Sequence, residues 1–279
     1  MRGFKQAIAV LTLAGLSSGG AQAGDLFSDF VASSKDGPGY WVVTVGGYVG
    51  AQPEFPGAKS YTFGLWPIID IRPAGSREWV TLPTDALSLT LYQTPNFRAG
   101  VAGDYILGRN HNDDSDVAGL HDINVTLLAG GFAEYYPAPF LRTRVELLQG
   151  FTGSDGLVAR FAGDYIIRPD YHWMFTAGPR LQFANTQYVS EYFSVNPVES
   201  VRSGLPVYRA SGGLNTVGLD ATVRYYFNDR FSVRAFVDWE HLVGDAADSP
   251  IVKFRGSEDQ IQVGIGAAFT FNYGPQPLK

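Results

Sequence analysis

Hydrophobic and polar residues alternate along most of the chain beyond residue 40. In the segment 260–272, six apolar side chains from Ile261 to Phe271 occupy alternate positions, and polar or small residues lie between them. The segments 213–227 and 231–243 repeat this pattern. A period of two places successive side chains on opposite faces of a β-strand, so the sequence predicts an all-β protein.

About twelve segments show this alternation, and the two short ones between residues 78 and 93 show it most weakly. The predicted strands lie near residues 40–51, 60–73, 78–82, 86–93, 96–107, 122–136, 140–150, 157–168, 173–185, 213–227, 231–243 and 260–272. Many of these segments have the length of about 9–11 residues or slightly more that a tilted strand needs to cross a bilayer.

The connections between the predicted strands alternate in length. The short set comprises residues 74–77, 94–95, 137–139, 169–172 and 228–230, and the mostly longer set comprises 52–59, 108–121, 151–156, 186–212 and 244–259. Outer-membrane barrels sort their connections in this way, because their periplasmic turns are short and their extracellular loops are long. We therefore expect a transmembrane antiparallel up-and-down β-barrel of about twelve strands. Aromatic residues near strand ends, such as Trp41, Tyr136 and Trp173, suit its interfacial girdles.

The opposite face of these strands would line the barrel interior, and it is charged. Its eight arginines and eight carboxylates are Asp70, Arg72, Arg98, Asp104, Glu134, Arg142, Arg144, Glu146, Arg160, Asp164, Arg180, Asp220, Arg224, Arg234, Asp238 and Glu240. Such groups are costly in lipid, so they must face the lumen and either pair or stay hydrated. This lumen charge network has two interpretations: ion pairs that brace the barrel, or a polar track for solutes.

Two arginines bear on this choice. Arg224 and Arg234 lie at equal distances from the turn 228–230, so they should stand opposite one another, as should Asp220 and Asp238. Like charges that stand opposite one another on paired strands are destabilising. We therefore expect both arginines to reach carboxylates on other strands, which would narrow the lumen and leave no wide channel.

The first 23 residues have the features of a cleaved secretory signal peptide. A short basic stretch at Arg2 and Lys5 precedes an apolar run over residues 7–16, and residues 21–23 (Ala-Gln-Ala) have the form of a cleavage site. The apolar run is shorter than the roughly 20 residues that a spanning helix needs. We expect residues 24–279 to form one barrel domain in the outer membrane of a Gram-negative bacterium.

Composition and charge narrow the function further. The chain has 27 acidic and 21 basic residues, and the resulting net charge of −6 disfavours a nucleic-acid partner. It has no cysteine, which excludes disulfides, thiolate metal sites and a cysteine nucleophile. An acidic loop contains His111, Asp113, Asp114 and Asp116, but their spacing fits no calcium-binding loop. We expect no bound metal and no cofactor, and outer-membrane lipid around the barrel.

A second polar cluster has the residue types of an acyl-transfer site. His241, Asp245, Asp248 and Ser249 lie within nine residues of one another. Proximity along a loop does not fix the geometry that a catalytic triad needs. Pro250 directly follows these residues and favours a structured loop, so we predict that the protein is not an enzyme.

The block at residues 242–252 (Leu-Val-Gly-Asp-Ala-Ala-Asp-Ser-Pro-Ile-Val) resembles the signature of the MltA-interacting protein (MipA/OmpV) family. Gly108-Arg109 followed by residues 119–123, and the 53–60 loop leading to Leu65-Trp66-Pro67, also match. The resemblance covers nearly the whole mature chain and implies an outer-membrane barrel. We call the part of this block that follows the predicted strand the family-motif loop; its residues are Gly244, Asp245, Asp248, Ser249 and Pro250.

Two functions remain open. The resemblance implies a scaffold, because the founding member of the family is described as joining a lytic murein transglycosylase to a bifunctional penicillin-binding protein. The charged interior favours a small-solute channel instead, with the 186–212 loop folded in as a constriction. Steady conductance in planar bilayers would favour the channel, and capture of murein (peptidoglycan) enzymes would favour the scaffold.

Overall fold

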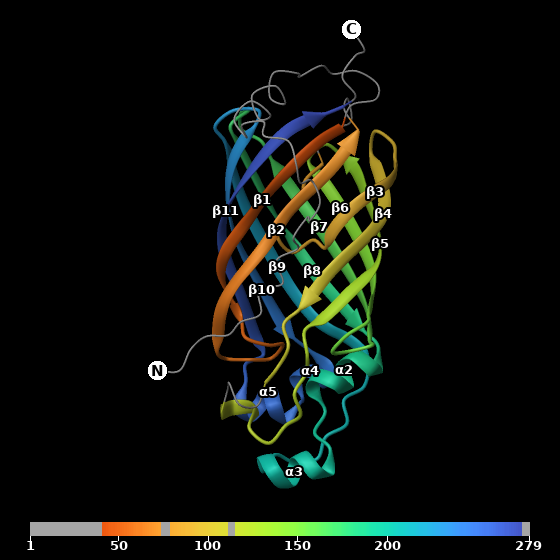
Figure 1. The fold of residues 1–279 in the computed structure, drawn as a ribbon, viewed down its shortest axis with the longest axis vertical. Coiled ribbons are helices and arrows are strands. Elements are labelled where there is room, and N and C mark those ends of the chain that lie inside the picture. The colour runs from red at the N-terminus through yellow and green to blue at the C-terminus, as the bar shows by residue number, and fades with distance from the viewer. Residues whose placement is uncertain (1–40, 74–78, 111–114, 275–279) are drawn as a thin grey trace, which may run out of the picture.

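The computed structural model describes residues 41–73, 79–110 and 115–274. In these residues, eleven antiparallel strands form one sheet that curls into a nearly closed barrel (Figure 1). The strands are β1 (Trp41–Pro53), β2 (Tyr61–Pro73), β3 (Leu87–Gln93), β4 (Phe97–Ile106), β5 (Thr126–Ala138), β6 (Leu141–Gly150), β7 (Leu157–Ile167), β8 (Trp173–Ala184), β9 (Gly213–Tyr226), β10 (Phe231–Leu242) and β11 (Asp259–Tyr273). The predicted all-β barrel is confirmed, with a strand count close to the expected twelve.

Each described strand pairs with the next one along the chain, except that β2 does not pair with β3. Because β1 also pairs with β11, β2 and β3 are the two edges of the sheet. No hydrogen-bonded ladder joins these edges within the described residues. Across the seam, the hydroxyl of Tyr105 on β4 donates to the backbone oxygen of Leu65 on β2 at 2.5 Å. The predicted register of β9 and β10 is confirmed, because Arg224 stands opposite Arg234.

The connections sort by barrel end as the sequence predicted, except for the predicted short turn 74–77, since the connection after β2 extends to residue 86. At one end, which we call the turn end, the turns that follow β3, β5, β7 and β9 have between two and five residues. At the other end, the loop end, the longer connections follow β1, β4, β6, β8 and β10. Figure 1 shows the helices gathered at this loop end.

One predicted strand, 78–82, is wrong. Residues 79–86 form no strand, and we call them the inner segment because they lie inside the barrel, where Trp79 and Val80 are buried. The backbone nitrogen of Val80 donates to the hydroxyl of Tyr136 at 3.0 Å. Tyr136 is therefore buried and points inward, not outward into a lipid girdle as expected. Since the chain enters the lumen here, eleven strands suffice to form the wall.

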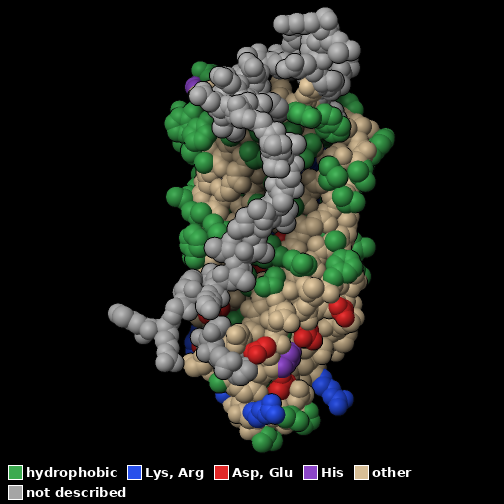
Figure 2. Space-filling view, viewed as in Figure 1, with side chains coloured by type: hydrophobic (Ala, Val, Ile, Leu, Met, Phe, Trp, Pro, Cys, Tyr) green, Lys and Arg blue, Asp and Glu red, His purple; other side chains and the backbone are tan. Residues whose placement is uncertain are grey.

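The outer surface of the wall is apolar. On β11, Ile261, Val263 and Ile265 are 40%, 42% and 65% exposed, whereas the neighbouring Gln260 is buried. Figure 2 shows hydrophobic side chains spread over the wall and charged ones concentrated towards the loop end. So broad an apolar surface is typical of a barrel wall that faces lipid. Among the described residues, no helix has the length and apolarity to span a membrane.

A helical cap closes the loop end. It comprises η1 (Ser115–Val117), α2 (Thr186–Phe193), α3 (Pro197–Ser203), α4 (Gly244–Ala247) and α5 (Pro250–Arg255). Tyr188, Tyr192 and Phe193 of α2 belong to the same buried cluster as Leu128 and Leu148 of the wall. The 186–212 connection therefore packs over the lumen, where the sequence suggested a constriction.

Glu199 holds two parts of the cap together. Its Oε2 accepts a hydrogen bond from the backbone nitrogen of Asn196 at 2.8 Å, which completes a capping box at the start of α3. Its Oε1 accepts from the backbone nitrogen of His121 at 2.9 Å. Burial raises the pKa of Glu199, but the hydrogen bonds from Asn196 and His121 outweigh this effect and leave the pKa below its ordinary value.

We expect the cap to loosen in acid. A carboxyl group with a lowered folded-state pKa stabilises the fold above its unfolded pKa, and this stabilisation is lost as the pH falls through the folded pKa. Hydrogen-exchange protection of residues 186–212 should therefore fall between about pH 5 and pH 3. Glu199→Gln should lower the protection already at pH 7 and remove most of the pH dependence.

Glu191 provides a control for this experiment. Its carboxylate lies 3.3 Å from the His121 ring, which Glu199 also contacts, but Glu191 is more exposed. Glu191→Gln should keep the wild-type dependence on pH. Equal protection of the wild-type cap at both pH values would contradict the role of Glu199.

Candidate functional site

The barrel interior holds a buried ion network centred on Glu134 of β5. Its carboxylate accepts hydrogen bonds from Arg98 of β4 at 3.0 and 3.1 Å. It also accepts from Arg142 at 3.0 Å and from Arg144 at 3.1 Å, both on β6. All four side chains are buried. Because three guanidinium groups share one carboxylate, further acidic groups must balance the remaining charge.

The network continues around the wall. Arg142 also pairs with Asp164 of β7 at 2.5 Å, and Asp164 pairs with Arg180 of β8 at 2.7 Å. Arg180 in turn reaches Asp220 of β9 at 3.2 Å. Inward-facing residues from six consecutive strands, β4 to β9, are thus connected through buried ion pairs.

The inner segment is part of this network. Its Asp85 pairs with Arg142 at 2.6 Å, and its Thr81 offers a backbone oxygen to Arg224 at 3.0 Å. Sequence reasoning missed Asp85, because it lies in the connection between two predicted wall strands, 78–82 and 86–93. The available signal was Pro83, which cannot donate to a strand ladder and argues against a central strand nearby.

The structure places twelve of the sixteen residues of the lumen charge network in buried positions. The remaining four are half-buried: Arg72, Asp104, Arg160 and Glu240. Among these, Arg72 pairs with Asp70 at 2.7 Å and Arg160 pairs with Asp104 at 2.5 Å.

The arginine pair on β9 and β10 differs from expectation. Arg224 donates to the hydroxyl of Tyr226 at 2.9 Å and lies over its ring. Arg234 forms no ion pair with any carboxylate in the described part of the chain, and its Nε and Nη1 have no hydrogen-bond partner there. The expected pairing with carboxylates on other strands is therefore wrong for Arg234. Both arginines and Thr81 of the inner segment line the same cavity at the turn end of the lumen.

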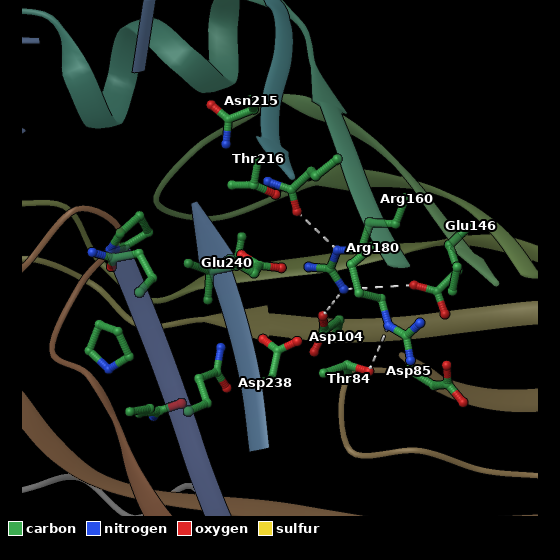
Figure 3. A pocket seen from close by; sticks show the side chains of 18 of the residues that line it. Thr84, Asp85, Asp104, Glu146, Arg160, Arg180, Asn215, Thr216, Asp238 and Glu240 are labelled. Atoms are coloured by element: carbon green, nitrogen blue, oxygen red, sulfur yellow. Dashed lines mark hydrogen bonds and ion pairs between the residues drawn. The ribbon is translucent and has the colours of Figure 1, made fainter. Parts of the chain in front are cut away.

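Described residues line two cavities along the lumen. The loop-end cavity has a volume of about 200 Å³, and Figure 3 shows Asp104, Arg160, Asp238 and Glu240 among its lining residues. The turn-end cavity has a volume of about 430 Å³ and is lined by arginines, including Arg234. Residues 79 and 81 line the turn-end cavity and residues 83–85 line the loop-end cavity. The inner segment therefore separates the two.

The structure does not assemble a catalytic triad in the family-motif loop. Ser249 is fully buried, and its hydroxyl donates to the backbone oxygen of Phe193 at 2.7 Å. His241 contacts Asp259 at 2.9 Å, and Asp248 pairs with Lys253 at 2.6 Å. Each side chain of the suggested triad is thus engaged with a different partner.

The same loop holds two parts of the cap together, since it joins α4 to the 186–212 connection. Asp245 accepts a hydrogen bond from the backbone nitrogen of Ser211 at 2.7 Å, and its backbone oxygen accepts from the hydroxyl of Tyr208 at 3.0 Å. Gly244 has a φ of 58°, a left-handed conformation that side chains rarely adopt. Pro250 lies in the first turn of α5, where its missing N–H is not needed.

The acidic loop offers no metal site in the described residues. Asp116 pairs with Lys59 at 3.1 Å, while His111, Asp113 and Asp114 lie outside the described residues. Within the part of the chain that the structure describes, no group of three or more His, Cys, Asp or Glu side chains could hold a metal ion. The predicted cleavage site at residues 21–23 also lies outside the described residues.

These features define a membrane β-barrel with a capped, internally braced lumen. Residues 45–271 match the family described as MltA-interacting protein MipA, and the chain belongs to that family. A comparison with curated proteins found no match.

Several solved structures of outer-membrane proteins show weak similarity. One is a NanC porin, with a TM-score of 0.40 and 9% identity over 82% of this chain and 98% of that one. Another is a bacterial polysaccharide outer-membrane secretin, with a TM-score of 0.39 and 10% identity over 85% and 100%. A third is an outer-membrane channel from Pseudomonas putida F1, with a TM-score of 0.38 and 10% identity over 87% and 98%. The fold assignment rests on the strand pairing of this chain.

Proposed function

We propose that this protein is a non-enzymatic outer-membrane barrel that acts as a scaffold for murein enzymes. Its family is described by interaction with MltA, a murein transglycosylase. A penicillin-binding protein is the second partner that the sequence resemblance suggests. In this proposal the loop end faces outward and the turn end faces the periplasm, as in other outer-membrane barrels with short periplasmic turns.

The occupied lumen is the structural observation that supports this proposal. The inner segment and the ion network around Glu134 fill the middle of the barrel with buried side chains. A barrel built in this way offers its surface to partners more readily than it offers a passage to solutes. At the turn end, Tyr171 is 84% exposed and its ring centroid lies 4.0 Å from that of His172. Exposed aromatic residues are frequent anchors of protein interfaces.

Capture of a murein transglycosylase by the full-length barrel in lipid nanodiscs tests the proposal. The wild-type protein should retain the enzyme, and Tyr171→Ala at the turn end should weaken the capture. Lys253→Gln, in an exposed ion pair at the loop end, should leave it unchanged. Absence of capture by the wild-type protein, or loss caused by the Lys253 variant alone, would contradict the proposal.

A small-solute channel is the second candidate, and the two charged cavities along the lumen favour it. Planar-bilayer recordings separate the two functions. The scaffold proposal predicts no steady open current for the wild-type barrel, because the inner segment lies between the cavities. A steady current with selectivity that changes in Arg160 or Arg234 variants would instead support the channel.

A further inference from the structure

A buried carboxylate in the loop-end cavity has no partner. Asp238 of β10 is 1% exposed, and neither of its oxygens has a hydrogen-bond partner among the described residues. It faces a cavity of about 200 Å³, so the space beside it is not filled by protein (Figure 3). An uncompensated buried charge is strongly destabilising, so a carboxylate in this position calls for a compensating group.

The arginines that line this cavity are already engaged. Arg144 pairs with Glu146 at 2.6 Å, Arg160 with Asp104 at 2.5 Å, and Arg180 with Asp164 at 2.7 Å. Figure 3 shows dashed contacts at Arg160 and Arg180 and none at Asp238 or Glu240 among the residues drawn.

The lining has more acidic than basic side chains. Five carboxylates face it, from Asp85, Asp104, Glu146, Asp238 and Glu240. The three engaged arginines supply all of its positive charge, since no lysine lines the cavity. Asp104 and Glu146 pair with lining arginines and Asp85 pairs with Arg142. Asp238 and Glu240 are left, and they form no ion pair in the described part of the chain.

Further unsatisfied acceptors lie towards the cap. The side-chain oxygens of Asn215 and Thr216 on β9 are buried and have no hydrogen-bond partner in the described residues, and both residues line the same cavity. Thr216 stands opposite Leu242, four residues along β10 from Asp238, or roughly 13 Å by strand rise. Along the strand direction, the carboxylates thus lie at one end of the cavity and the neutral oxygens lie nearer the cap.

We propose that the loop-end cavity binds a small aliphatic amine, whose ammonium group is held by Asp238 and Glu240. An ammonium group donates three hydrogen bonds and accepts none, which matches a lining with unsatisfied oxygen acceptors. The volume of about 200 Å³ has room for a molecule of roughly six non-hydrogen atoms. The side-chain oxygens of Asn215 and Thr216 receive the far end of the molecule. This site is independent of the scaffold function, since it lies in the lumen and not on the turn-end surface.

Calorimetric titration of the folded full-length barrel with 1,4-diaminobutane at pH 7 tests this site. The diamine should bind to the wild-type protein and raise its melting temperature. The neutral analogue 1,4-butanediol should bind at least tenfold more weakly, because it carries no charge for Asp238. Asp238→Asn, which keeps the shape of the side chain, should weaken diamine binding at least tenfold.

Two further variants make the result decisive. Asp229→Asn makes the same charge change in an exposed turn at the other end of the barrel and should bind the diamine as the wild-type protein does. Glu240→Gln provides a second substitution inside the cavity and should also weaken binding, whether or not the Asp238 variant folds. No binding to the wild-type barrel at millimolar diamine, or wild-type affinity in a folded cavity variant, would overturn the proposal.

Discussion

Replacing Glu134 with glutamine should lower the free energy of unfolding of the barrel by about 3–5 kcal/mol, because it removes one partner from several buried ion pairs at once. The carboxylate lies within 3.1 Å of Arg98, Arg142 and Arg144. Glutamine keeps the size of the side chain, so no cavity is created, but it supplies no negative charge. Only the remaining carboxylates would then compensate the positive charges of the three guanidinium groups. Urea-induced unfolding in lipid vesicles, followed by tryptophan fluorescence, measures this loss.

Asp248→Asn is the control for the Glu134 variant. Its carboxylate also forms an ion pair, with Lys253 at 2.6 Å, but both side chains are largely exposed. Exposed pairs contribute only about 0–1 kcal/mol, so this variant should unfold almost as the wild-type protein does. A Glu134→Gln barrel as stable as the control would mean that the network does not brace the lumen. Glu134 is linked through Arg142 to Asp85 of the inner segment, so a steady current that appears only in this variant would show that the network also seals the barrel.

The wall of the barrel could be predicted from the sequence because lipid and lumen impose opposite demands on alternate residues. β9, β10 and β11 were each predicted to within one residue at both ends. The turn 228–230 fixed the register of β9 against β10, since equal distances from a tight turn determine which residues meet. β5 was placed four residues too early, at 122. Ile123 does bridge to Arg109, but as an isolated pair outside the strand.

The inner segment could not be predicted in this way, because burial inside a barrel and exposure to lipid both favour apolar residues. Trp79, Val80 and Leu82 look like part of a wall strand, yet all three are buried in the lumen. The partners in the ion pairs could not be predicted from the sequence either. Alternation shows that Arg142 points inward, but its partner Asp85 arrives on a segment that leaves the wall.

Replacing Val263 with arginine should lower the free energy of unfolding by about 2–4 kcal/mol, as expected for a charge on the lipid face of a membrane barrel. Val263 lies within β11 and is 42% exposed on the apolar outer surface. Its neighbours across the two strand pairings are Ala51 of β1 and Val237 of β10, so no carboxylate stands beside it on this face. Folding in vesicles, followed by the heat-resistant band on gels and by urea titration, measures the loss.

Gln262→Arg adds the same side chain one residue earlier, on the opposite face of β11. Gln262 is half-buried and lines the loop-end cavity, where carboxylates outnumber arginines by two. The new charge would have room there and would meet a complementary potential, so we expect a change of less than about 1 kcal/mol. Both variants add one arginine to β11, at adjacent positions on opposite faces, so the comparison sets the lipid face against the lumen face. Equal destabilisation of both would show that the wall does not separate lipid from a polar lumen at this strand.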